Sequence, residues 1–451
     1  MTNKLTLWAD HIHYNQVTTY DLCSFKTVVE SFVTSGESYT NDTNRNLGFV
    51  HYKTLKDIAP FLNNHRLILS VPQKLDSRES YNEGTFYDTL AHALEICKVH
   101  PDAYIMTGCL WDEHYLTINN VSVFDKISSY FKVYDVPINR LIYVHSNASI
   151  PDYTIDRIPD DAPVPKFIYD SFYIYRFSKL KPEYLPEIGF GDKKKHFIML
   201  NRRPSTHRLA VGSYLWKNYK DKINLSCRLQ GNNPYIKEEV SLDIQKSYKD
   251  AMHYGNFEVT LDEFNQFIQA LPLKIDHQDC TGLPLELQDS VPKELLHESA
   301  CYIIGETHWN HVNYSSAAEP LRPHNQFNID DLKPNGGFHT EKSLKSFLWG
   351  LPAIWIAPAH TLRYLRTLGF KTFGNMIDES YDDEEDRYTR MNMVLAEIDK
   401  VAKITDLNAW YQQGIEIYKH NHNVITQMIQ QNNFEVIGNY CDSIAQKEGR
   451  L

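Results

Sequence analysis

The chain has 451 residues, of which 42% are hydrophobic and 23% charged, so it can bury two cores and does not have the composition of a disordered protein. Its net charge of −11 argues against broad, nonspecific binding of nucleic acid, although a local basic patch remains compatible with it. Seven scattered cysteines without a CxxC pair make a disulfide scaffold or zinc cluster unexpected and fit a cytoplasmic location, and no apolar stretch is long enough to span a membrane.

Apolar runs alternate with stretches of helical periodicity along the first third of the chain. We expect strands at 4–9, 66–71, 104–107 and 141–145, and a helix over 85–98. The stretch 156–165, with three prolines and three acids, is expected to be a connector. This alternation is typical of a parallel α/β sheet.

The alternation resumes after the connector. We expect strands at 196–200, 300–305 and 353–357, helices at 204–218 and 341–349, and mostly helix over 386–432. The chain therefore predicts two α/β units followed by a helical tail.

The start of the helix at 341–349 is a candidate site. Thr340 can cap it, three apolar residues form a buried stripe, and Gly350 with Pro352 ends it. A helix start presents unpaired amides and a positive dipole, so with Lys342 in the first turn we expect it to bind a diphosphate. A nearby carboxylate, Glu306 or Glu341, would accept sugar or ribose hydroxyls. The alternative is that Glu341 only favours the helix start and Lys342 is a solvated surface charge.

Longer motifs around this helix resemble known glycosyltransferases. The run 340–342, followed by a helix, Gly350-Leu351-Pro352 and an apolar strand, resembles the donor-binding segment of fucosyltransferase-like enzymes of the GT-B class. The stretches 362–373 and 377–382 resemble a family of glycosyltransferases found largely in tailed phages and large viruses. The stretch 197–208, which contains a strand, Asn-Arg, Pro and His-Arg, resembles the opening of the same family's donor domain.

The resemblance implies a GT-B architecture, with two Rossmann-like domains and a cleft between them. It places an acceptor-side domain at 1–190, a nucleotide-sugar donor domain at 191–425, and a C-terminal helix in 426–451 that packs back on the first domain. In the resembled enzymes, an arginine early in the donor domain and the lysine of the motif hold the diphosphate, and the acid of the motif contacts the ribose.

Carried onto this chain, the resemblance gives a set of donor-binding candidates: Arg202, Arg203, Arg208, Glu306, Thr340, Glu341, Lys342 and Tyr381. Lys342 and Glu341 match most clearly, and the three arginines compete for one phosphate-binding role. Glu306 matches the acid of a Phe-Glu-Asn-type motif, although Thr307 follows it here. Tyr381 either contacts the donor or packs in the core.

Two charged segments flank this region. Residues 193–208 hold six Lys or Arg and no acid, which favours a diphosphate site, with a solvated basic surface as the alternative. Residues 378–386 hold seven acids whose spacing does not follow an EF-hand loop, so we expect no metal site. We expect part of this acidic segment to lie near the donor cleft.

Sugar transfer with inversion needs a base on the acceptor side, and the ends of parallel strands usually supply such residues. Asp10, which closes the first strand, is the first candidate; Asp112 and Glu113 come next and His145 third. A turn or helix-capping role is the alternative for Asp10.

These observations predict a metal-independent, inverting glycosyltransferase. It would need no cofactor, only a UDP- or GDP-linked sugar as co-substrate. If the viral resemblance holds, a 5-hydroxymethylated pyrimidine in phage DNA is one acceptor and a glycan the other. The rival hypotheses are an inactive nucleotide- or glycan-binding module and a sugar-processing hydrolase, which would need two facing carboxylates.

Overall fold

The computed structural model describes residues 5–11, 47–52, 65–71, 83–109, 117–118, 121–145, 163–169, 174, 177, 180, 185–189, 192–201, 205–227, 244–271, 273, 291–306, 339–431 and 433–450. For 5–11, 47–52, 65, 70, 83–86, 108–109, 117–118, 121–125 and 433–435 it describes the backbone alone. The chain divides into two compact units, Met1–Phe172 with Gln430–Leu451, and Tyr173–Ile429. The second unit begins before the expected boundary at 190/191, because Phe177 and Leu180 are buried in its core.

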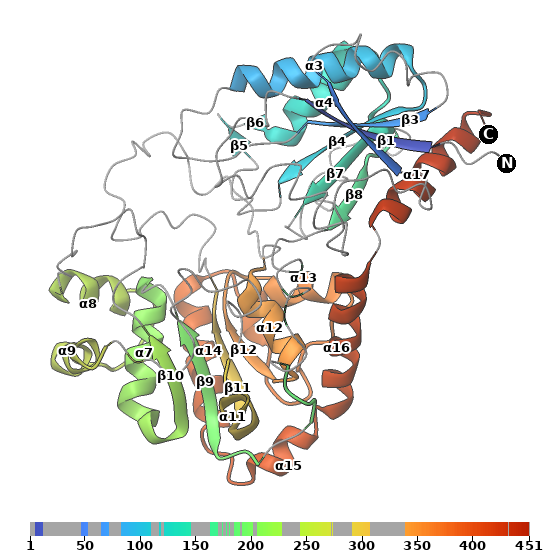
Figure 1. Cartoon of the computed structure of the whole chain (residues 1–451). Coiled ribbons are helices and arrows are strands. Elements are labelled where there is room, and N and C mark those ends of the chain that lie inside the picture. The colour runs from blue at the N-terminus through green and yellow to red at the C-terminus, as the bar shows by residue number, and fades with distance from the viewer. Residues whose placement is uncertain are drawn as a thin grey trace. The chain divides into compact units, whose positions relative to one another are not determined.

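The first unit contains a six-stranded parallel sheet (Figure 1). Its strands are β1 (Leu5–His11), β2 (Leu47–Tyr52), β3 (His65–Ser70), β4 (Ala103–Cys109), β7 (Leu141–His145) and β8 (Lys166–Tyr169). The helices are α3 (Glu83–Val99), α4 (Val123–Val133) and α17 (Asn433–Lys447), and β5 (Thr117–Ile118) pairs with β6 (Val121–Ser122). The sheet order β2-β1-β3-β4-β7-β8 is that of a doubly wound, Rossmann-like fold.

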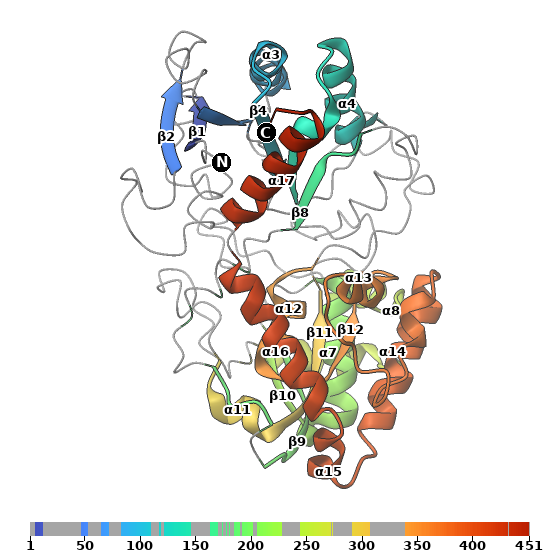
Figure 2. The same cartoon turned by 90° about the vertical axis from the view of Figure 1, so that its right-hand side faces the viewer.

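Both faces of this sheet are covered, but by different parts of the chain. Successive side chains of a strand point to opposite faces. Leu67 and Leu69 of β3 pack in one cluster with α3 and α4, whereas Ile68 packs in another with Ile437 and Ile444 of α17. Figure 2 shows α17 along the sheet, on the side away from α3. The last helix thus completes the core of the first unit.

The second unit contains a four-stranded parallel sheet in the order β10-β9-β11-β12. Its strands are β9 (Lys195–Asn201), β10 (Ile223–Cys227), β11 (Ser299–Gly305) and β12 (Ala353–Ile356). Its helices are α7 (Thr206–Tyr219), α8 (Ile244–Met252), α9 (Leu261–Gln269), α11 (Lys293–Glu298), α12 (Glu341–Trp349), α13 (Thr361–Thr367), α14 (Arg387–Val401), α15 (Leu407–Gln412) and α16 (Ile415–Gln430).

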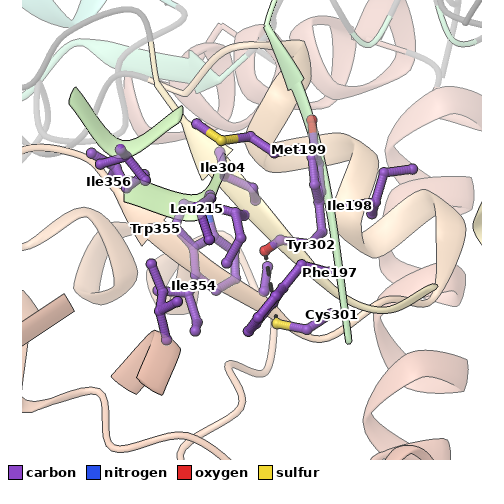
Figure 3. Close-up of a cluster of buried hydrophobic side chains, with 14 of the residues drawn as sticks. Phe197, Ile198, Met199, Leu215, Cys301, Tyr302, Ile304, Ile354, Trp355 and Ile356 are labelled. Carbon is purple, nitrogen blue, oxygen red and sulfur yellow. Dashed lines mark hydrogen bonds between the residues drawn. The ribbon is translucent and has the colours of Figure 1, made fainter. Parts of the chain in front are cut away.

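The core of the second unit explains why its strands are continuous apolar runs. Every residue of β11 and β12 is buried, as expected for parallel strands covered on both faces. Figure 3 shows side chains of β9, β11 and β12 interdigitating, with Trp355 among them. The predicted apolar stripe of α12 is confirmed, since Leu344, Phe347 and Leu348 are at most 2% exposed. Each such side chain contributes about 1.5–3 kcal/mol on burial.

The expected strands and helices correspond closely to observed elements in both units, which confirms a two-sheet α/β fold. Of the expected connector at 156–165, only residues 163–165 are described, and β8 follows them. Among the described helices, none combines the length and apolar character needed to cross a membrane.

Candidate functional site

The candidate site lies at the carboxyl ends of β9 and β11. The strand order of the second sheet reverses between these neighbouring strands. From β9 the chain passes through α7 to β10 on one side of the pair, and from β11 it passes through α12 to β12 on the other side. Right-handed crossovers send the two helices to opposite faces of the sheet. In open α/β sheets, ligands bind in the crevice that this arrangement leaves beyond the strand ends.

The end of β11 carries the side chain of Arg208, from the first turn of α7. The Nε of Arg208 donates to the carbonyl oxygen of Gly305 (3.0 Å). A Cβ at Gly305 would lie 2.9 Å from Cγ of Arg208 and 3.3 Å from Oδ1 of Asn201, so only glycine leaves room for both. The side-chain oxygen and nitrogen of Asn201 are buried and have no hydrogen-bond partner among the described residues.

Glu306 follows Gly305 and binds the start of α12. Its Oε1 accepts from the Thr340 amide (3.2 Å), the Ser343 amide (3.2 Å) and the Ser343 hydroxyl (2.6 Å), and its Oε2 accepts from the Thr340 hydroxyl (2.7 Å). The indole Nε1 of Trp355 in β12 donates to the Ser343 hydroxyl (3.0 Å). Glu306 is 2% exposed. One buried carboxylate therefore fixes the first turn of α12 on the end of β11.

This geometry corrects one expectation and confirms another. Thr340 is the N-cap of α12, as predicted, and accepts from the Lys342 amide (3.3 Å). The helix start, however, does not present a set of unpaired amides, because Glu306 and Thr340 bind three of the backbone N–H groups at residues 340–343. An anion at this end would therefore depend on side-chain cations more than on helix amides.

Lys342 supplies such a cation in a nearly buried position. Its Nζ donates to Oε1 of Glu341 (2.9 Å) and to the Thr340 hydroxyl (3.2 Å), and the Lys342 side chain is 13% exposed. Burial lowers the pKa of the Lys342 amine, the nearby carboxylates of Glu341 and Glu306 raise it, and Arg208 lowers it. Arg208 and Lys342 thus form a pair of cations near two carboxylates.

Two histidines lie beside these charges. Nε2 of His207 bonds to the carbonyl oxygen of Glu306 (2.9 Å), and burial, with Arg208 and Lys342, lowers the pKa of His207 to about 3. Burial lowers the pKa of His339 to about 4, and within the described part of the chain neither ring nitrogen of His339 has a hydrogen-bond partner. Both imidazoles are therefore neutral at pH 7.

The basic segment 193–208 is not a single patch. The seven-residue strand β9 separates Lys193 and Lys195, at its beginning, from Arg208, beyond its end, a separation of about 20 Å at 3.3 Å per residue. Lys193 is 5% exposed, donates to the Leu296 carbonyl (3.2 Å), and lies 4.0 Å from the Tyr411 ring centroid. The expectation that this segment gathers surplus charge at the diphosphate site was therefore wrong for these lysines.

The acidic segment 378–386 serves mainly as local caps. Asp382 is buried and accepts from the Leu362 and Arg363 amides at the start of α13 (2.9 and 3.1 Å), and Asp386 caps α14. Glu379 accepts from the Phe373 amide (2.6 Å). Within the described part of the chain, no group of three or more His, Cys, Asp or Glu side chains is placed to hold a metal ion.

Tyr381, in the same segment, is 2% exposed and belongs to the core of the second unit. Its hydroxyl accepts from the Trp355 amide (3.3 Å). This placement favours the packing role that the sequence left open, because the ring has almost no surface to offer a ligand.

The acceptor-side candidates are less fully described. The backbone of Asp10 lies near the carboxyl end of β1, beside Ser70 of β3, where the strand order of the first sheet reverses. His145 ends β7, is 2% exposed, and has edge contacts with the Phe167 and Tyr169 rings at 6.0 and 5.9 Å. Asp112 and Glu113 lie outside the described residues.

Of the arginines that compete for the phosphate, only Arg208 is described, and Arg202 and Arg203 lie outside that part of the chain. The structure brings Arg208, Glu306, Thr340, Glu341 and Lys342 together at one sheet edge. Sequence reasoning missed Asn201, Gly305 and Ser343. The glycine at the end of a buried strand was the one local signal for them.

Comparison with known proteins adds no assignment. No protein-family model matches the chain, and a search of curated proteins finds no match to its sequence. The site is therefore defined by its own geometry: a buried carboxylate that fixes a helix start, and two cations at the switch point of a Rossmann-like sheet.

Proposed function

We propose that the protein is a glycosyltransferase that takes its sugar from a nucleoside diphosphate sugar. The observation that carries the proposal is the pairing of Arg208 with Lys342 beyond the ends of β9 and β11. A diphosphate leaving group carries dense negative charge, which two partly desolvated cations stabilise more strongly than water does. The switch point of a doubly wound sheet is where a nucleotide is expected to bind.

The proposed architecture is GT-B, with the second unit on the donor side and the first on the acceptor side. Two sheets of doubly wound order support it. Transfer would proceed with inversion: a base deprotonates the acceptor hydroxyl, whose oxygen attacks the anomeric carbon while the nucleoside diphosphate departs toward Arg208 and Lys342. Asp10 remains the first candidate for the base, because it lies at the switch point of the first sheet.

For the acceptor, we keep a hydroxyl group of either modified DNA or a glycan. DNA was suggested by the viral resemblance, and the basic segment that would offset the negative net charge is divided between the two ends of β9. An assay that offers labelled donor with hydroxymethylated duplex DNA and a panel of glycans, at two salt concentrations, separates the two. If only glycans became labelled, the DNA hypothesis would be refuted and the transferase proposal would stand.

The test of the donor site is Lys342→Ala. Because Lys342 is held against a desolvation cost, its removal should leave the fold intact. Loss of a charge-assisted contact to the leaving group should raise the barrier by about 2–4 kcal/mol, roughly a hundredfold in rate. A panel of UDP- and GDP-sugars, read by thermal shift and by sugar release, would supply the donor.

Lys419→Ala is the matched control. Lys419 also forms an ion pair with a nearby acid, Glu416 (3.1 Å), but its side chain is 59% exposed on α16. We expect this control to keep full activity. Near-normal turnover in purified Lys342→Ala would overturn the donor-site assignment.

A further inference from the structure

Glu306 has a different role from the contact with sugar or ribose hydroxyls that the sequence suggested for Glu306 or Glu341. A carboxylate that contacted a ribose would need an oxygen free for the sugar hydroxyls. Both oxygens of Glu306 are instead bonded within the protein, to the amides and hydroxyls of Thr340 and Ser343, at 2.6–3.2 Å. Four donors around a carboxylate that is 2% exposed use most of its acceptor capacity.

The residues that Glu306 binds are those that set the position of Lys342. The Thr340 hydroxyl accepts from both the backbone amide (3.3 Å) and the Nζ (3.2 Å) of Lys342, and it donates to Glu306 (2.7 Å). Ser343 follows Lys342 directly and is bonded to Glu306 on one side and to Trp355 on the other. Thr340 and Ser343 thus hold the backbone on either side of Lys342.

We infer that Glu306 is a positioning residue, which holds the Lys342 amine toward the anion site by fixing the first turn of α12 to the end of β11. The inference rests on the proposed donor role of Lys342. Glu306 acts through Lys342 and does not itself touch the ligand. Its side chain contributes geometry, since its own negative charge would repel a diphosphate.

The first measurement is the titration of the Lys342 amine, which needs no ligand or activity. Among the described residues, the charged and titratable groups that act on it are Glu341, Glu306 and Arg208, with His207 close by. Acylation of Lys342 at several pH values, quantified by peptide mass spectrometry, gives its pKa in wild type and in Glu306→Gln. If Glu306 holds the helix start, its loss lets the amine relax toward water and the pKa of Lys342 rises.

The opposite sign would overturn the inference. If Glu306 affected Lys342 only through its charge, removal of that charge would lower the pKa of Lys342 further. Asp382→Asn is the matched control, because Asp382 is also a buried carboxylate that binds the first turn of a helix in this unit. It should lose stability as Glu306→Gln does but leave the Lys342 titration unchanged.

The second measurement is pyrophosphate binding in a double-mutant cycle. We expect Glu306→Gln and Lys342→Ala each to weaken binding by about tenfold or more, and the double variant to be within about twofold of Lys342→Ala. Additive losses would show that Glu306 acts independently of Lys342. If Glu306→Gln lost nucleoside diphosphate binding but kept pyrophosphate binding, Glu306 would instead be assigned a contact with the ribose.

A third variant protects the test against misfolding. Ser343→Ala removes one of the hydroxyl donors to Glu306 and leaves the contacts of the Lys342 side chain in place. It should shift the pKa of Lys342 in the same direction as Glu306→Gln by a smaller amount. If Lys342→Ala binds pyrophosphate normally while these titration shifts occur, the proposed function fails and the positioning role stands.

Discussion

Gly305→Ala should disturb the candidate site through space alone. The added Cβ would lie 2.9 Å from Cγ of Arg208, where ordinary contact begins near 3.4 Å, so the arginine must move by about half an ångström. Cγ lies close to the backbone of α7 and cannot simply swing away, and Asn201 limits the other side at 3.3 Å. The hydrogen bond from Arg208 to Gly305 would be strained as well.

Overpacking of this kind costs about 1–3 kcal/mol. For a unit of this size, roughly 2–4 °C per kcal/mol gives a drop of about 2–12 °C in Tm, measured by differential scanning calorimetry. Because Arg208 is displaced, pyrophosphate binding should weaken by about tenfold. Gly438→Ala in α17 is the control: nothing lies within 4 Å of its added Cβ, and alanine in a helix should stabilise by about 0.5–1 kcal/mol. If Gly305→Ala left both Tm and anion binding unchanged, the packing argument for this sheet edge would be refuted.

Three further predictions concern other parts of the chain. Burial lowers the pKa of Lys193 to about 7, below its unfolded value near 10.5. Between about pH 7 and pH 10.5 the unfolded chain therefore binds a proton at this lysine that the folded chain does not, and the free energy of unfolding rises with pH over this range. Lys193→Met should therefore raise the unfolding free energy by about 1–3 kcal/mol at or below pH 7, with the gain shrinking toward pH 10 in denaturant titrations; a gain that stays constant with pH would contradict this. Ile437→Ala should destabilise the first unit by about 2–5 kcal/mol, because Ile437 is 1% exposed. The first unit should then unfold at a lower urea concentration; a midpoint equal to that of the wild type would mean that Ile437 is not buried in the core of this unit. Asp10→Asn should lower turnover at least a hundredfold with donor affinity unchanged in a calorimetric titration, and a collapse of donor binding would make Asp10 structural.

The sequence predicted those features that depend on neighbours along the chain. The strand expected at 300–305 is β11 because a continuous apolar run suits a parallel strand buried on both faces. The helix expected at 341–349 begins at a threonine cap and ends at Gly350 in the left-handed conformation, φ 63°, as α12 does. In each case the physical cause lies within a few residues.

The features that the sequence did not predict depend on contacts between distant residues. Glu306 binds Thr340, 34 positions later, and no local pattern indicates that its carboxylate turns toward that helix. Lys193 and Arg208 lie in one basic run, yet a strand carries them to opposite ends of the sheet. Tyr381 resembled a donor contact by position, but its environment is set by Trp355 of β12.

The packing of α17 on the first sheet has a consequence for synthesis on the ribosome. Ile68, Tyr104 and Ile142 are made early, but the helix that covers them spans Asn433–Lys447. All the strands and helices of the second unit lie between, so that unit can fold while one face of the first sheet is still exposed to water. Closing so long a loop is slow, and an uncovered apolar face favours aggregation in the meantime. Nascent chains stalled before residue 433 should therefore bind chaperones through the first unit, and release them once α17 has been made.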